Sequence, residues 1–296
     1  EGMTIDESKV PRVFHEVVWT GDLENHLLSE ASGMAQSSTD PDVFFAINDS
    51  INEPQLFAFG PDGGDLGFWR IDIERNVDWE DIAAFRQDGE PYLLIADTGD
   101  NFRWRPHVEL LVVREPRVEE LAMDEVIPLV SRIRFRYPDG YRDAEAVAVD
   151  EKEGAVYIIT KRTIPAEVYR VPLEILPDDS LVVMTASRVA VLDNIPQPNQ
   201  QDLWEDPDYG AYRSMPTALD MKHDVAAVIT YKDAYIYRRG RRQTWPEAFA
   251  RLPERVALPP VNAREAGLLT GNGKYLYVTS EREDGRSAVG IYRVEL

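Results

Sequence analysis

Five segments of this chain repeat one layout, and the repeat restricts the fold more than any other feature of the sequence. Each segment begins with a short lead strand after small or acidic residues, and two further apolar strands follow it after turns. The lead strands are centred on Met34, Ile82, Val147, Leu219 and Leu268. A period of roughly 40–50 residues with several short strands is typical of β-propeller blades. We therefore expect an all-β fold, with residues 1–296 forming a single propeller domain.

The two ends of the chain suggest how the ring closes. The last repeat has three strands before Leu296, and residues 13–20 form an apolar strand that has no local partner. Pairing the two would complete the fifth blade and remove an open sheet edge. We predict a five-bladed β-propeller of four-stranded antiparallel blades, closed by the N-terminal strand, and we keep six blades as the alternative. Residues 121–126 are the one stretch in which we expect helical structure.

The charge and the residue types exclude several classes of function. A net charge of −21 argues against nucleic acid, because binding phosphates requires Lys and Arg. No apolar run approaches the roughly 18 residues that span a bilayer, so we expect no membrane insertion. The absence of cysteine excludes thiolate sites, and none of the four histidines lies near the predicted site, which disfavours His-ligated zinc.

Acidic residues concentrate where the predicted blades should converge. In an antiparallel blade the start of the first strand and the end of the second lie at the same end, so these loops should surround one mouth of the central funnel. Glu80 and Glu145 occupy the same position in two successive repeats. Oxygen-rich sites of this kind suit Ca²⁺ or Mg²⁺. The predicted metal ligands are Glu80, Asp97, Asp100, Asn101 and Glu145; the predicted catalytic residues are Glu80, Glu145, Lys161 and Asp49; and the predicted substrate-binding residues are Arg162, Tyr231, Lys232 and Glu281.

Three motifs resemble those of a group of uncharacterised bacterial β-propeller proteins: NVDWEDIA at 76–83, IADTGDN at 95–101 and DAEAV at 143–147. The resemblance is good over residues 30–171 and implies a periplasmic or extracellular, secreted protein. It implies no activity. More distantly, the DAEA lead strand is similar to a strand of phytase-like esterase propellers, and this similarity implies calcium and phosphoester hydrolysis.

Three functions follow from these observations and remain open. The first is a metal-assisted hydrolase, with calcium as the expected ion, that acts on a small polar ester or phosphoester. The second is a five-bladed glycosidase in which Asp49, Asp81 and Glu145 supply an acid and a base. The third is a propeller without catalysis that binds a small polar ligand or a protein partner. Residues 193–213 interrupt the strand pattern, and long loops of this kind are often functional lids.

Overall fold

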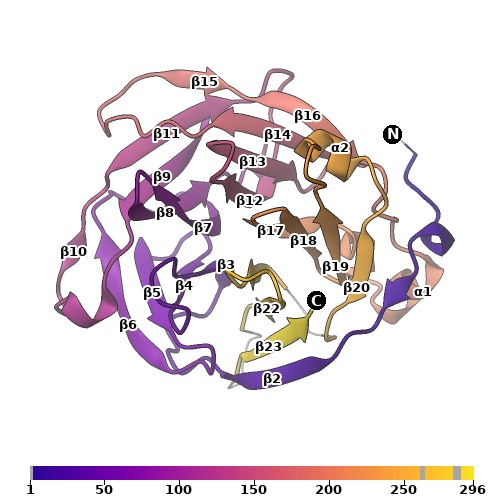
Figure 1. Cartoon of the computed structure of the whole chain (residues 1–296), viewed down its shortest axis with the longest axis horizontal. Coiled ribbons are helices and arrows are strands. Elements are labelled where there is room, and N and C mark those ends of the chain that lie inside the picture. Colours follow the sequence, from indigo (N-terminus) through magenta and orange to yellow (C-terminus); the bar gives the residue numbers. More distant parts are fainter. Residues whose placement is uncertain (1–2, 261–263, 283–287) are drawn as a thin grey trace.

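The computed structural model describes residues 3–260, 264–282 and 288–296, and its strands form five sheets arranged in a ring (Figure 1). Each sheet contains four antiparallel strands that follow one another from the axis outward, as the repeat predicts. The first blade contains β3 (Ala31–Gln36), β4 (Phe44–Asn48), β5 (Gln55–Phe59) and β6 (Asp65–Ile71); the second β7 (Trp79–Gln87), β8 (Glu90–Asp97), β9 (Val108–Arg114) and β11 (Ser131–Arg136); the third β12 (Ala144–Asp150), β13 (Ala155–Thr160), β14 (Ala166–Pro172) and β16 (Ser187–Leu192); the fourth β17 (Pro216–Lys222), β18 (Val225–Thr230), β19 (Asp233–Arg238) and β20 (Glu254–Ala257); and the fifth β21 (Ala266–Leu269), β22 (Tyr275–Thr279), β23 (Gly290–Glu295) and β2 (Val17–Asp22).

The N-terminal strand closes the ring, as predicted. β2 pairs antiparallel with β23, with Trp19 opposite Tyr292, so the first and last parts of the chain share the fifth blade (Figure 1). The strand begins four residues later than the sequence suggested. Arg12 and Val13, which form β1, pair instead with β20 of the fourth blade. The N-terminal segment therefore ties two blades together, and the six-bladed alternative is wrong.

Short parallel strands add a further link between neighbouring blades. β10 (Val126–Ile127) pairs with β6, and β15 (Val183–Thr185) pairs with β11. Each belongs to the connection that leads into the outer strand of the following blade, as β1 does. Three of the five sheets consequently have five strands, one more than the predicted four.

The hydrophobic core lies between the blades. Five clusters of buried side chains each combine residues of two adjacent blades, and the fifth blade packs on the first in the same way as the others. A blade covered on both faces needs apolar residues at successive positions, which is why the middle strands read as continuous apolar runs. β13, for example, is buried throughout.

Helical structure is sparse, and it does not occur at residues 121–126, where the sequence analysis predicted it. α1 (Gln200–Glu205) and α2 (Trp245–Phe249) each begin with a capping box, while residues 121–126 contribute only the start of β10. The preceding turn, η2 (Val118–Glu120), and the others, η1 (Glu7–Lys9) and η3 (Gly210–Tyr212), are 3₁₀ helices. No helix among the described residues is long and apolar enough to cross a membrane.

Candidate acidic site at the central funnel

A β-bulge recurs at the start of the inner strand in four blades, and it presents two of the predicted site residues. The pairing of β7 with β8 skips Glu80, and the pairing of β12 with β13 skips Glu145. Ser32 and Thr217 are skipped in the same way in β3 and β17. A bulge redirects the extra side chain out of the normal alternation. The equivalence of Glu80 and Glu145 in the sequence therefore corresponds to a shared backbone feature.

Six carboxylates from four blades form a cluster that we call the acidic funnel. Asp49, Asp78 and Glu80 each offer one oxygen within 4.8 Å of the others, and Asp49, Glu265 and Glu281 do the same. Asp49 belongs to both groups and follows β4, while Glu281 follows β22 at the equivalent end of its blade. The acidic funnel consists of Asp49, Asp78, Glu80, Glu145, Glu265 and Glu281.

One lysine and one tyrosine accompany these carboxylates. The Lys161 ammonium donates to Oε1 of Glu145, and it lies 3.8 Å from Oε1 of Glu265. The same ammonium lies 5.3 Å from the centre of the Tyr231 ring, whose hydroxyl donates to Glu265 at 2.8 Å. Burial is the largest single influence and would lower the pKa of Lys161, but Glu145, Tyr231 and Glu265 together outweigh it and raise that pKa above its ordinary value. Lys161 is therefore a fixed positive charge among the acids.

Crowding and burial disfavour the ionised form of most of these carboxylates. Burial, followed by repulsion from Glu265, raises the pKa of Glu281 to about 9. Burial is also the largest cause for Asp49 and Asp78, whose pKa values rise to about 7 and about 6. The pKa values of Glu80 and Glu145 lie well above the ordinary range for the same reason. A bound cation would remove the repulsion that contributes to these shifts.

Two local features fit a cation between these groups. Glu145 is 5% exposed, and its Oε2 is buried without a hydrogen-bond partner, although Oε1 is paired with Lys161. Burial is the largest cause of the raised pKa of Glu80, and repulsion from Glu145 is the second largest. The unpaired oxygen therefore belongs to a carboxylate beside the group of Asp49, Asp78 and Glu80. Gly99 supplies the space, because a β-carbon there would overlap the carboxylates of Asp78 and Glu80. The donor set is all oxygen, as calcium and magnesium require.

The other predicted metal ligands lie in a neighbouring loop and have protein partners. Asp97 forms an ion pair of 2.9 Å with Arg105, and Asp100 accepts the backbone N–H of Arg105 at 3.1 Å. Asn101 accepts from Arg162 at 2.7 Å. The groups of carboxylates that are close enough to share an ion, among the residues that the structure describes, include neither aspartate. These side chains shape the loop that carries Gly99, and Arg162 joins it to the third blade.

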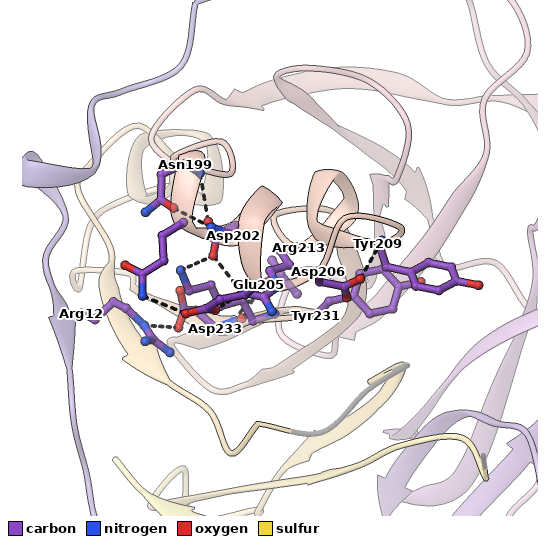
Figure 2. Close-up of polar contacts among 12 residues, drawn as sticks. Arg12, Asn199, Asp202, Glu205, Asp206, Tyr209, Arg213, Tyr231 and Asp233 are labelled. Carbon is purple, nitrogen blue, oxygen red and sulfur yellow. Dashed lines mark hydrogen bonds and ion pairs between the residues drawn. The ribbon is translucent and has the colours of Figure 1, made fainter.

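The insertion at 193–213 is folded against the fourth blade. Asp202 of α1 accepts from the Lys232 ammonium at 2.6 Å and from Arg213 at 3.0 Å, and it forms the capping box with Asn199 (Figure 2). Lys232, which we predicted to bind substrate, therefore anchors the insertion. The ordered helix inside this segment was not expected from the sequence.

Asp81, a member of the predicted glycosidase set, is buried among backbone groups. Its carboxylate accepts the backbone N–H of Val147 at 3.0 Å and that of Leu219 at 3.1 Å, which belong to the next two blades. Asp220 accepts from Leu269 of the fifth blade at 2.8 Å in a similar way. Both aspartates link the inner strands around the axis. Asp81 is 0% exposed, and it belongs to neither of the carboxylate groups that lie close enough to share an ion among the described residues.

Two funnel residues received no role in the sequence analysis. Asp78 lies directly before β7, and Glu265 lies directly before β21. Both lie at a lead strand, so their location was foreseeable, but nothing in the sequence shows that Asp78 and Asp49 meet across two blades. In the fifth blade the inner strand has no register shift, and the acid precedes the strand instead of occupying a bulge.

Comparison with known proteins supports the fold and no specific activity. No family model matches the chain, and no curated protein matches it either. The PQQ-bound aldose sugar dehydrogenase of Streptomyces coelicolor is 10% identical, with a TM-score of 0.51 over 97% of this chain and 100% of that one. A putative oxidoreductase (glucose dehydrogenase) of Thermus thermophilus is 12% identical, with a TM-score of 0.49 over 95% and 99%. A nidogen/laminin complex is 14% identical, with a TM-score of 0.46 over 86% and 73%. The structural match to the Streptomyces protein shows a shared fold. At an identity this low, the match shows nothing about activity.

Proposed function

We propose that the acidic funnel binds a divalent cation of the calcium type, and that the protein is a metal-assisted hydrolase of a small polar ester or phosphoester. The observation that carries the proposal is the buried, unpaired Oε2 of Glu145 beside carboxylates whose oxygens already lie within 4.8 Å of one another. An unpaired carboxylate oxygen in a buried position is costly unless something compensates it. A cation is the group that satisfies several such oxygens at once.

Asp49, Asp78 and Glu80 would hold the ion, with Glu145 beside them. When bound, such an ion polarises an ester or phosphoester oxygen and lowers the pKa of a bound water. Lys161 neutralises Glu145 and contributes a positive charge that an anionic substrate requires. Glu281 lies close to Asp49 and Glu265 and is placed to contact a ligand beside the ion.

Calcium binding is the first test of the proposal. We expect saturating calcium to raise the melting temperature of the protein by about 4–5 °C, because a ligand at about 100 times its Kd adds about 2.7 kcal/mol. Glu80→Gln should remove most of this increase. Glu53→Gln is the matched control, since Glu53 is exposed and pairs with Arg70 at 3.1 Å outside the funnel. The proposal would be overturned if calcium left the melting temperature unchanged and a calorimetric titration showed no calcium binding.

A substrate panel then tests the reaction. The calcium-loaded protein should hydrolyse p-nitrophenyl acetate or p-nitrophenyl phosphate, and a chelator should abolish the activity. Cleavage of p-nitrophenyl glycosides without metal would favour the glycosidase instead. Oxidation of an aldose that depends on added PQQ would favour an activity like that named for the Streptomyces neighbour. We further propose a periplasmic or extracellular location, where sites of modest calcium affinity are filled.

A further inference from the structure

A cavity of about 260 Å³ lies at the funnel-side end of the second blade, and none of the six funnel carboxylates is among the described residues that line it. Its walls come from the start of β9, the end of β11, and the loops that join these strands to β8 and β12. Pro106, Val108 and Phe135 supply apolar surface. Ligand pockets are typically apolar clefts of roughly 300–1,000 Å³ with a few polar groups, so this cavity has the size for a small ligand.

The Tyr137 hydroxyl at this cavity is buried without a hydrogen-bond partner. Tyr137 is 8% exposed, its ring packs edge to face on Phe135 at 5.5 Å, and its hydroxyl has no partner among the residues that the structure describes. Burial is the largest cause of its raised pKa, and the charges that act on it further are those of Asp143, Arg105, Arg142 and Asp100. Three of these four residues line the cavity, so the hydroxyl lies at the cavity wall. A buried polar group without a partner calls for an explanation, and a ligand oxygen supplies one.

Positive charge predominates among the side chains that line the cavity. The charged and titratable groups of the lining are Arg105, Arg136, Arg142, His107 and one carboxylate, Asp100. The two oxygens of Asp100 accept backbone N–H groups of their own loop, at 3.0 and 3.1 Å. In a chain whose net charge is −21, this cavity is therefore a local concentration of cations.

Arg136 is the arginine of this set whose charge is not neutralised. Arg105 and Arg142 form ion pairs, at 2.9 and 3.0 Å, with carboxylates that do not line the cavity. Arg136 ends β11 and is exposed, and its Nε donates to the Thr185 hydroxyl at 3.3 Å. No carboxylate of the described residues forms an ion pair with its guanidinium, which leaves that group able to bind an anion.

We propose that this cavity binds a small organic anion, with its oxyanion group at Arg136 and the Tyr137 hydroxyl and its apolar part against Phe135. An arginine guanidinium matches the geometry of carboxylate and phosphate oxygens, and it is more weakly hydrated than an ammonium group. A cationic ligand would meet repulsion from the arginines of the lining. The cavity shares no residue with the acidic funnel, so this inference stands apart from the proposed hydrolysis.

Isothermal titration calorimetry of the full chain tests the proposal, with chelator present so that no divalent cation occupies the funnel. The probes are benzoate and phenylphosphonate, which carry a carboxylate or a phosphorus oxyanion on the same ring and contain no ester bond to hydrolyse. We expect one-site binding with a Kd below about 1 mM for at least one of them, and the tighter probe identifies the anionic group. Inorganic phosphate should bind at least about tenfold more weakly, because it has no apolar part to bury. Benzylamine, which has the same ring and a positive charge, should not bind.

Two variants test the two polar groups separately. Tyr137→Phe should weaken binding about three- to tenfold, as the loss of one hydrogen bond does, while the melting temperature without ligand stays the same or rises because the hydroxyl has no partner in the described fold. Arg136→Gln should weaken binding about tenfold and reduce its dependence on ionic strength. Arg114→Gln is the matched control, because Arg114 ends β9 away from the cavity, pairs with Glu90 at 2.8 Å and should leave affinity unchanged.

Circular dichroism of each variant shows whether it has kept the fold. The inference would be overturned if neither benzoate nor phenylphosphonate bound, since the cavity would then hold water alone, or if benzylamine bound as tightly as they do. Binding that both variants left unchanged would place the anion elsewhere and would overturn it as well. A lower melting temperature of Tyr137→Phe without ligand would show that the hydroxyl is already satisfied in the folded protein, and this would remove the observation on which the inference depends.

Discussion

Replacing Asp49 by asparagine should stabilise the folded protein at alkaline pH while it weakens the proposed cation site. Burial raises the pKa of Asp49 from 3.8 to about 7; the backbone N–H of Ser50 opposes the shift, and repulsion from Glu265 adds to it. A carboxyl whose pKa is higher in the folded state stabilises the fold fully below its unfolded pKa, and that stability is lost as pH rises through the folded value. Asparagine has nearly the same shape, accepts the same N–H and carries no charge at any pH.

The magnitude follows from the size of the shift. A difference of roughly three pKa units corresponds to about 4 kcal/mol as an upper bound, at about 1.4 kcal/mol per unit. Asp49 is only partly buried, so water reduces the penalty, and we expect a gain of about 1–2 kcal/mol above pH 8. In a chain of this length such a gain raises the melting temperature by about 2–3 °C.

Thermal melts followed by circular dichroism, with chelator present, check this prediction. The difference between Asp49→Asn and the parent protein should be largest near pH 8.5 and should shrink steadily toward about pH 4. Asp208→Asn is the control, since Asp208 is an exposed aspartate of the same face outside the funnel. A gain of equal size at both pH values, or a loss at pH 8.5, would refute the reasoning.

Three further changes test other parts of the structure. Gly99→Ala should weaken calcium binding about tenfold, because the new methyl group displaces the carboxylates of Asp78 and Glu80; calorimetry that shows unchanged affinity would contradict this. Asp81→Ala should cost about 2–4 kcal/mol in urea unfolding, since it leaves backbone N–H groups of two neighbouring blades without an acceptor, and a cost near zero would refute that role. Deleting residues 1–22 should expose the edge of β23 and cause aggregation, so a soluble monomer in gel filtration would count against closure by β2.

The sequence contains local signals for both helices. Asn199 and Asp202 frame α1, and Thr244 and Glu247 frame α2, each with the three-residue spacing of a capping box. Both helices are very short, so they show almost no helical periodicity. The helix predicted at 121–126 is wrong, because the last residue of that stretch, Val126, pairs with β6, the outer strand of the first blade.

The sequence determined the number of blades, the order of their strands and the strand that closes the ring, because these depend on local apolar patterns and turn residues. It also indicated that Glu80 and Glu145 belong to the site, since both occupy the same position of the repeat in two successive blades. The partners of the individual acids depend on tertiary structure alone. Asp97 and Asp100 looked as suitable for a cation as Asp49 did, but the fold of their own loop pairs the first with Arg105 and the second with backbone N–H groups. Only the packing of blades brings Asp49 close to Asp78 and Glu80. Contacts between residues far apart in the chain depend on how the strands are staggered around the axis, and no local pattern encodes that stagger.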